Sequence, residues 1–242
     1  WNKIDRLPVY DERPLLKSNE SNNSGRIKIA FDIAVLGLGY FNEKARTGVF
    51  RVTEYILRGL INSSEFDLCL CSSIPDLLSA CQEFLNAEFQ NTNLSVLAIP
   101  QLRSHNISLY HSSFYPIPLE VDYCRKVVTI YDLINIKFPE FFEYTEDTLV
   151  TNCLKSITED DYIACISQST KQDILNYNNS FCNQQVIVTP LAADKNKFYP
   201  CRDKELIDNV HQKYHIPKSP YLLSVCTLEP RKNLVHVIRC FL

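Results

Sequence analysis

Residues 27–60 read IKIAFDIAVLGLGYFNEKARTGVFRVTEYILRGL, and this stretch decides the fold class. Its first ten residues form a nearly continuous apolar run, which predicts a buried strand. Residues 37–48 are polar and contain glycines, which predicts a loop. The remainder predicts a helix that begins at Gly48. The apolar stripe of that helix is Val49, Val52, Ile56 and Leu60. A strand followed by a loop and a helix is the repeating unit of a parallel sheet.

The same alternation continues along the rest of the chain. Further strands are predicted at 66–72, 94–100, 107–113, 126–133, 161–167, 185–191 and 221–226. Further helices are predicted at 75–89, 144–157, 167–177, 203–215 and from residue 232 onward. We therefore expect an α/β protein whose mostly parallel sheet is covered by helices on both faces.

Composition excludes several classes of protein. The chain has 242 residues, a net charge of -3 and no basic stretch, which argues against a nucleic-acid partner. No apolar run reaches the ~18 residues of a membrane-spanning helix. The ten cysteines are scattered without a C-x-x-C pair, and several lie in apolar runs. Reduced, buried thiols are therefore expected, with no metal site and no disulfide framework.

The ends of the sequence carry a separate expectation. There is no Met, and the chain begins with Trp1, which predicts a segment of a longer protein. Residues 1–25 contain KSNESNNSG, a polar run typical of a linker or an N-terminal extension.

Candidate functional residues follow the predicted strands, because ligands bind beyond the carboxyl ends of the strands in parallel sheets. His111 lies in LYHSSFYPIP, just past a predicted strand, and Tyr131 and Asp132 follow VVTI. Each also has an ordinary structural explanation, as a hydrogen-bonded side chain or a turn-capping carboxylate. No nucleophile elbow and no ordered Ser–His–Asp set is present, so a hydrolase is unsupported.

Two glycine patterns point in different directions. GLGYFN, 37–42, has two glycines of the dinucleotide fingerprint but Asn42 in place of the third, which argues against a nicotinamide or flavin enzyme. Gly48 precedes a predicted helix whose N-terminal N–H groups are suited to an anion. A flexible loop explains Gly48 equally well.

Several segments, in order along the chain, resemble motifs of the family 4 glycosyltransferases. They are TGVFRVTEYILRGL, LYHSSFYPIP, VVTIYDLINIKFPEFF, DYIACISQSTKQDI, VIVTPLAADKNKFYP and LEPRKNL. Each motif alone is modest, but their collinear order is specific. The resemblance runs from about Ile27 to the end of the chain. It implies the GT-B architecture, in which two Rossmann-like domains face each other across a cleft.

The resemblance also implies a domain organisation. Residues 26–200 would form the N-terminal, acceptor-side Rossmann-like domain. Residues 201–242 would form a connecting helix and the start of a truncated, nucleotide-sugar-binding C-terminal domain. Because most of that second domain would be missing, the fragment by itself is expected to be inactive.

The reaction that the resemblance implies is retaining transfer of a sugar from a nucleoside-diphosphate sugar to a glycan or a lipid-linked acceptor in polysaccharide biosynthesis. No metal and no cofactor would be needed beyond the nucleotide-sugar co-substrate. The expected location is the cytoplasm, with possible peripheral contact at the inner face of the cell membrane.

Residue roles are implied where this sequence matches the family motifs. Arg231 and Lys232, at a turn before a predicted helix, would grip the diphosphate together with Gly48, since cations there stabilise charge that develops on the leaving group. The acceptor-side loop would contain Ser167 and Ser169. The remaining positions, which would orient a reacting hydroxyl, are His111, Tyr131 and Asp132.

Two departures from the family pattern leave alternatives open. Many members have His where this chain has Tyr131, and many have Gly where it has Cys226. The alternatives are a sugar-nucleotide epimerase on the same architecture and a non-catalytic scaffold that binds sugar or a partner.

Overall fold

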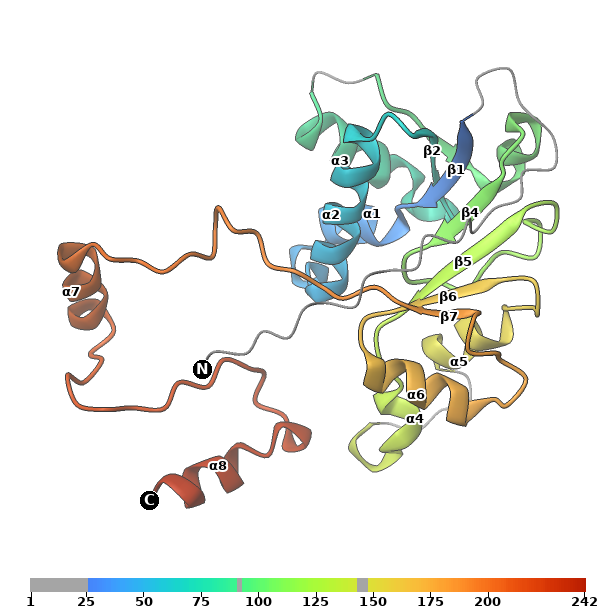
Figure 1. Ribbon diagram of the computed structural model, residues 1–242. Coiled ribbons are helices and arrows are strands. Elements are labelled where there is room, and N and C mark those ends of the chain that lie inside the picture. The colour runs from blue at the N-terminus through green and yellow to red at the C-terminus, as the bar shows by residue number, and fades with distance from the viewer. Residues whose placement is uncertain (1–25, 91–92, 143–147) are drawn as a thin grey trace.

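The computed structural model describes residues 26–90, 93–142 and 148–242. The predicted 1–25 linker therefore lies outside the described residues. In the described part, the chain forms an α/β domain around one seven-stranded, entirely parallel sheet. The predicted fold class is confirmed, and the arrangement is Rossmann-like (Figure 1).

The strands have the order β3-β2-β1-β4-β5-β6-β7. They are β1 Ile27–Asp32, β2 Phe66–Ser72, β3 Val96–Ala98, β4 Leu109–Ser112, β5 Arg125–Ile130, β6 Tyr162–Cys165 and β7 Val186–Val188. All strands are parallel. From β1, strands β2 and β3 are added on one side of the sheet, and β4 to β7 are added on the other side. The order therefore reverses between β1 and β4, which is the place where sheets of this kind hold ligands.

Helices cover both faces of the sheet. They are α1 Ala34–Phe41, α2 Gly48–Asn62, α3 Leu78–Glu88, α4 Ile134–Lys137, α5 Leu149–Lys155 and α6 Gln168–Tyr177. Two further helices, α7 Lys204–Lys213 and α8 Leu234–Phe241, follow β7 and do not cover the sheet (Figure 1). The 3-10 turns are η1 Glu43–Ala45, η2 Pro75–Leu77, η3 Ile99–His105, η4 Pro139–Phe141 and η5 Pro230–Lys232. The adjacent β1 residues Ala30 and Phe31 belong to two separate core clusters, because side chains alternate along a strand. One cluster contains residues of α2 and α3, and the other contains residues of η3, α5 and α6.

The predicted loop at 37–48 is partly wrong, because residues 34–41 form helix α1. Both glycines of GLGYFN serve packing in this helix. A Cβ at Gly37 would lie 2.5 Å from Cys81 Sγ, and a Cβ at Gly39 would lie 2.3 Å from the Phe50 ring. The glycines therefore bring α1 against α3 and α2, and they form no phosphate loop.

Helix α2 begins at Gly48, as predicted. Its most buried side chains are Phe50, Thr53 and Leu57. The predicted stripe is only partly buried, so its position is about one residue off. The reason is that α2 packs against α1 as well as against the sheet. The buried face of α2 is therefore turned from the face that the sequence predicted.

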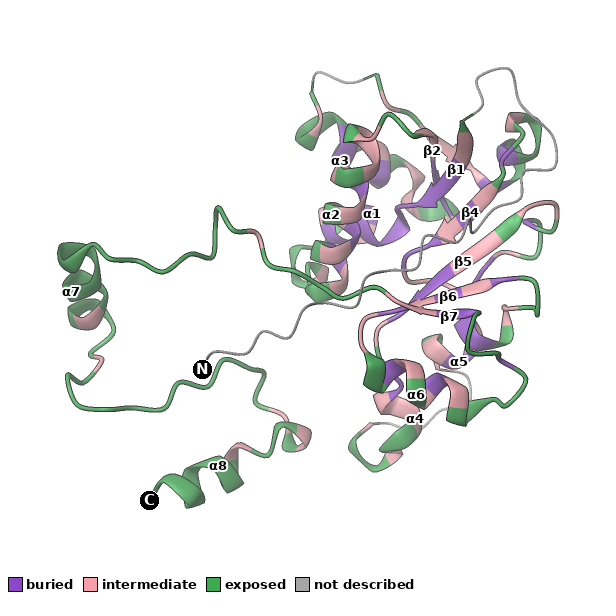
Figure 2. Cartoon of the chain, in the orientation of Figure 1, coloured by how far each residue is buried: buried purple, intermediate pink, exposed green. Residues whose placement is uncertain are grey.

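The segment after β7 differs in character from the sheet domain. No residue from Ile187 to Leu242 is buried, as Figure 2 shows for α7 and α8. The strand predicted at 221–226 is not formed, since this stretch has no neighbouring strand among the described residues. An apolar run becomes a strand only where a second strand satisfies its backbone. The described residues also contain no helix that is both long and apolar enough to cross a bilayer.

Candidate functional site at the carboxyl end of β5

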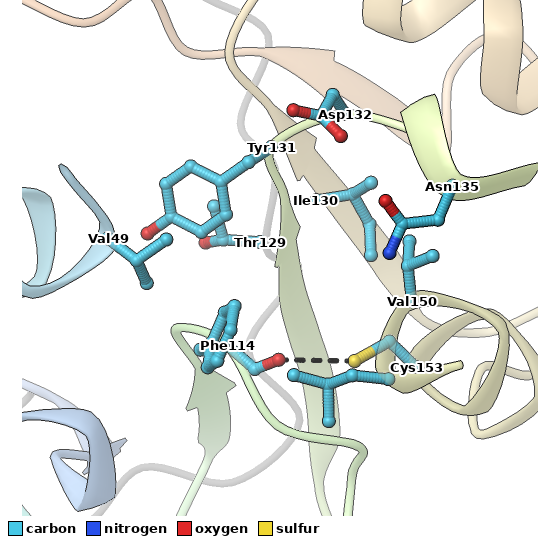
Figure 3. Close-up of a pocket in the computed structure, with 10 residues that line it drawn as sticks. Val49, Phe114, Thr129, Ile130, Tyr131, Asp132, Asn135, Val150 and Cys153 are labelled. Carbon is cyan, nitrogen blue, oxygen red and sulfur yellow. Dashed lines mark hydrogen bonds between the residues drawn. The ribbon is translucent and has the colours of Figure 1, made fainter. Parts of the chain in front are cut away.

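A pocket of about 220 Å³ lies where β5 ends. Its lining residues come from five parts of the fold: the start of α2, the loop after β4, the end of β5, the short helix α4 and helix α5. They are Val49, Phe114, Thr129, Ile130, Tyr131, Asp132, Asn135, Leu149, Val150 and Cys153. Figure 3 shows this arrangement, with Asp132 at the upper rim and Asn135 turned toward Ile130 and Val150. The predicted residues Tyr131 and Asp132 thus line the same pocket as Val49, which follows Gly48 at the start of α2.

Tyr131 contributes the most unusual polar atom of the pocket. Its hydroxyl is buried and makes no hydrogen bond of good geometry with any described residue, and Thr53 is the side chain that interacts with it. Its ring packs edge-on against Phe114, with the ring centroids 6.4 Å apart. Burial raises the pKa of Tyr131 to about 12, so the hydroxyl keeps its proton at neutral pH. A buried hydroxyl without a partner is unfavourable in a stable fold and is therefore a candidate for contact with a ligand.

Asp132 lies exposed at the rim, immediately after β5. One of its carboxylate oxygens accepts the Ile134 backbone N–H at 3.1 Å, which closes a turn just before α4. The structural role considered for this residue is therefore present. The second carboxylate oxygen can still accept a bond from a ligand, because an ionised carboxylate has two oxygens with several acceptor positions. Asn135, one turn further on, places an amide beside it.

His111 lies within β4 and not beyond it, which corrects the prediction. Its Nε2 is 2.9 Å from Thr129 Oγ1, and its ring packs against Phe31 with centroids 5.2 Å apart. Burial lowers the pKa of His111 to about 4. The ring is thus neutral at pH 7 and does not line the pocket. It acts on the pocket through Thr129, as a residue that positions a wall.

Replacing His111 by Gln should remove part of the acid sensitivity of the fold. The pKa of the folded state, about 4, lies below the ordinary value of 6.5. As the pH falls from 6.5 toward 4, His111 binds a proton in the unfolded chain but stays neutral in the folded chain. The free energy of unfolding therefore decreases. Between pH 7.5 and 5 the unmodified protein should lose about 2 kcal/mol more than His111→Gln. Urea unfolding of both at the two pH values checks this, and equal losses would contradict it.

Gly48, Ser167 and Ser169 do not line the pocket. Gly48 is exposed, and a Cβ there would meet nothing within 4 Å. The side chain of Ser167 caps α6 by accepting the Thr170 N–H at 3.1 Å. Thr170 in turn donates its hydroxyl to the Tyr131 carbonyl at 3.1 Å, which ties this loop to the site. Ser169 is exposed on the first turn of α6.

Arg231 and Lys232 are not brought to the pocket. Both lie in η5, which stands apart from the sheet domain in Figure 1. Arg231 Nε pairs with Glu229 Oε2 at 2.5 Å, while Lys232 is exposed. The helix predicted to begin near Lys232 is present as α8, but it starts two residues later, at Leu234, because Asn233 adopts a left-handed φ of 50°. In this structure, the cation pair therefore belongs to a separate turn.

Sequence reasoning missed Asp32, the buried carboxylate where the strand order reverses. It is 1% exposed at the end of β1. Its Oδ1 accepts the N–H of Ala34 at 2.9 Å and of Ser73 at 3.2 Å, and its Oδ2 accepts the Tyr110 hydroxyl at 3.2 Å. An acidic residue within the apolar run 27–36 was the available signal. Asp32 joins β1, β2 and β4 at the edge of the sheet that carries the pocket.

Cysteine and metal chemistry adds no second site. All ten cysteines are free, and burial raises the pKa of Cys153 in the pocket wall to about 12, so its thiol is not ionised. Across the described ranges, no group of three or more His, Cys, Asp or Glu residues is placed to hold a metal ion.

Comparison with known proteins gave no relative: no family model matches this chain, and no curated protein and no solved structure matches it.

Proposed function

We propose that this chain supplies the acceptor side of a retaining glycosyltransferase, which moves a sugar from a nucleoside-diphosphate sugar to a hydroxyl held at the β5 pocket. Two lines support the proposal. The ordered motifs resemble family 4 glycosyltransferases. In addition, three of those motifs contribute residues to one pocket at the carboxyl end of β5: Val49 from the first, Phe114 from the second, and Tyr131 with Asp132 from the third.

The observation that carries the proposal is the Tyr131 hydroxyl. It is buried in the pocket region and, apart from its interaction with Thr53, has no partner of good hydrogen-bond geometry among the described residues. Folding gains nothing from such a group, since its hydrogen bonds to water are lost and not replaced. A hydroxyl of the acceptor or of the sugar would satisfy it. Asp132 and Asn135 at the rim provide further acceptors and donors for the same ligand.

The chemistry needs no enzyme nucleophile. The bond between the anomeric carbon and the diphosphate oxygen breaks, and a bond from the acceptor oxygen to the same face of that carbon forms. The acceptor proton passes to the leaving phosphate. The residues at the pocket orient the acceptor, and proximity of this kind supplies much of the rate in group transfer. In the proposal, Arg231 and Lys232 neutralise the leaving diphosphate from the second domain, beside Gly48 of α2.

Replacing Tyr131 by Phe should separate function from folding. The change removes an unsatisfied hydroxyl, so we expect stability to be unchanged or to rise by about 1 kcal/mol. Sugar transfer should fall by about 10-fold or more, since an orienting hydrogen bond is lost. The assay uses the protein as its gene encodes it, a panel of nucleoside-diphosphate sugars and hydroxyl acceptors, and mass spectrometry of the products.

Tyr123→Phe is the matched control. Tyr123 also has a buried hydroxyl without a partner among the described residues, but it precedes β5 and so lies at the opposite end of that strand. Its replacement should have the same effect on stability and none on transfer. Equal activity of the two variants would remove the support from Tyr131. Epimerisation of the donor, or sugar binding without transfer, would favour the epimerase or the scaffold instead.

A further inference from the structure

The walls of the β5 pocket are apolar on most sides. The apolar lining residues are Val49, Phe114, Ile130, Leu149, Val150 and Cys153. Among the polar lining groups, Thr129 is already bonded to His111. Of the lining residues that the structure describes, Tyr131, Asp132 and Asn135 remain for a ligand. In Figure 3, Asp132 lies at the upper rim and Asn135 turns its amide toward Ile130 and Val150, so the described residues offer few hydrogen bonds inside the pocket.

The volume of the pocket limits what can enter it. A dry apolar cavity of ~150 Å³ holds one benzene molecule, whereas pockets for drug-sized ligands have ~300–1,000 Å³. The β5 pocket, with about 220 Å³, therefore suits one six-membered ring with a small substituent. A sugar ring of that size carries hydroxyls around its whole edge. Burying them against these walls would leave most of them without partners, which is costly.

Two aromatic side chains make part of the wall. Phe114 and Tyr131 meet at an interplanar angle of 66°, so their ring planes are not parallel and a ligand ring can pack against either of them. The Cys153 thiol, which donates to the Phe114 carbonyl at 3.2 Å, adds a polarisable sulfur to the wall. Contacts between sulfur and aromatic rings are favourable. This lining favours an aryl ring over a flexible acyl chain.

We propose that the acceptor enters this pocket with an aryl ring and presents a hydroxyl to the polar lining residues Tyr131, Asp132 and Asn135. The role of the aryl compound as an acceptor rests on the proposed function. The binding site for an aryl ring does not depend on sugar transfer. The substrate class is an aryl alcohol or a phenol-bearing aglycone. A bare sugar is excluded from the interior of the pocket.

Direct binding tests the inference without any assay of activity. The probe is 4-methylphenol, titrated into isotope-labelled protein and followed by NMR, with D-glucose as the polar comparison. For a ligand of this size we expect a Kd of about 0.1–10 mM, with shifts at amides of β5, α4 and α5. Glucose should not saturate the same amides.

Filling the pocket should abolish this binding. Val150→Phe, from α5, and Val49→Phe, from α2, each add a ring at a different wall, and each should weaken 4-methylphenol binding by about 10-fold or more. Because the two sites belong to different helices, one variant remains informative if the other fails to fold. Leu119→Phe is the control, since Leu119 is 93% exposed and outside the pocket, and its affinity should be unchanged.

The outcomes separate the two proposals. No saturable binding of 4-methylphenol, tighter binding of glucose at the same amides, or full binding to both filled variants would overturn the aryl site. Aryl binding with no sugar transfer to any aryl alcohol would leave the site standing and count against the glycosyltransferase. Transfer to sugars alone, without aryl binding, would do the reverse.

Discussion

Asp32→Ala should destabilise the fold by about 2–4 kcal/mol, among the largest effects expected of a single change outside the apolar core. The carboxylate is buried and accepts two backbone N–H groups and the Tyr110 hydroxyl. Alanine would leave three donors in the interior without an acceptor, and each unmade bond costs about 1–3 kcal/mol before relaxation. Thermal and urea unfolding of the two proteins measures the loss.

Asp32→Asn is the control that isolates hydrogen bonding from charge. Its side-chain oxygen can accept the Ala34 and Ser73 N–H groups, and its amide can donate to Tyr110. Burial raises the pKa of Asp32, so the ionised form is less favourable in the folded state than in the unfolded chain. Wild-type stability should therefore decline as the pH rises through the folded pKa, and this decline should be absent in Asn. If Asn proved as damaging as Ala at pH 7, hydrogen bonding would not explain the effect.

Gly37→Ala should cost about 1–3 kcal/mol through overpacking between α1 and α3. The added Cβ would lie 2.5 Å from Cys81 Sγ and 3.0 Å from two backbone atoms, Cys81 N and Leu77 O. The sulfur can rotate away, but the backbone atoms belong to the start of α3 and must move with the helix. The melting temperature and the urea midpoint should both fall.

Gly59→Ala provides the opposite sign in the same protein. Gly59 lies in α2, and a Cβ there meets nothing within 4 Å. Alanine should therefore raise stability by about 0.5–1 kcal/mol, because glycine is a poor helix former. Comparison of the two single variants tests whether tight packing or backbone flexibility determines the effect of each glycine on stability. Equal effects of the two substitutions would contradict the packing role of Gly37.

The strands were predictable because strands of a parallel sheet, covered on both faces, must be nearly continuous apolar runs. The six segments predicted between residues 66 and 191 all contain strands of this sheet. The start of α2 at Gly48 and the Ser167 cap of α6 were also readable, since helix starts depend on local residues. Tyr131 and Asp132 could be selected for the same reason, as residues directly after a strand.

Helix α1 could not be predicted in this way. Its sequence, AVLGLGYF, contains two glycines, which have low helix propensity and matched a loop. It is a helix because α2 and α3 pack closely against it, and only glycine permits that distance. The converse holds at 221–226, where an apolar run typical of a strand has no partner strand among the described residues.

The sequence by itself determined the alternation of strands and helices, the parallel sheet and the strand-end residues, because periodicity and capping act within a few residues of each position. Tertiary structure alone decided that Asp32 joins three strands, that His111 is neutral, and that Asn135, Val150 and Cys153 share a pocket with Tyr131. Burial, desolvation and the pairing of buried polar groups depend on segments distant in the chain, and no local pattern records which segments will meet.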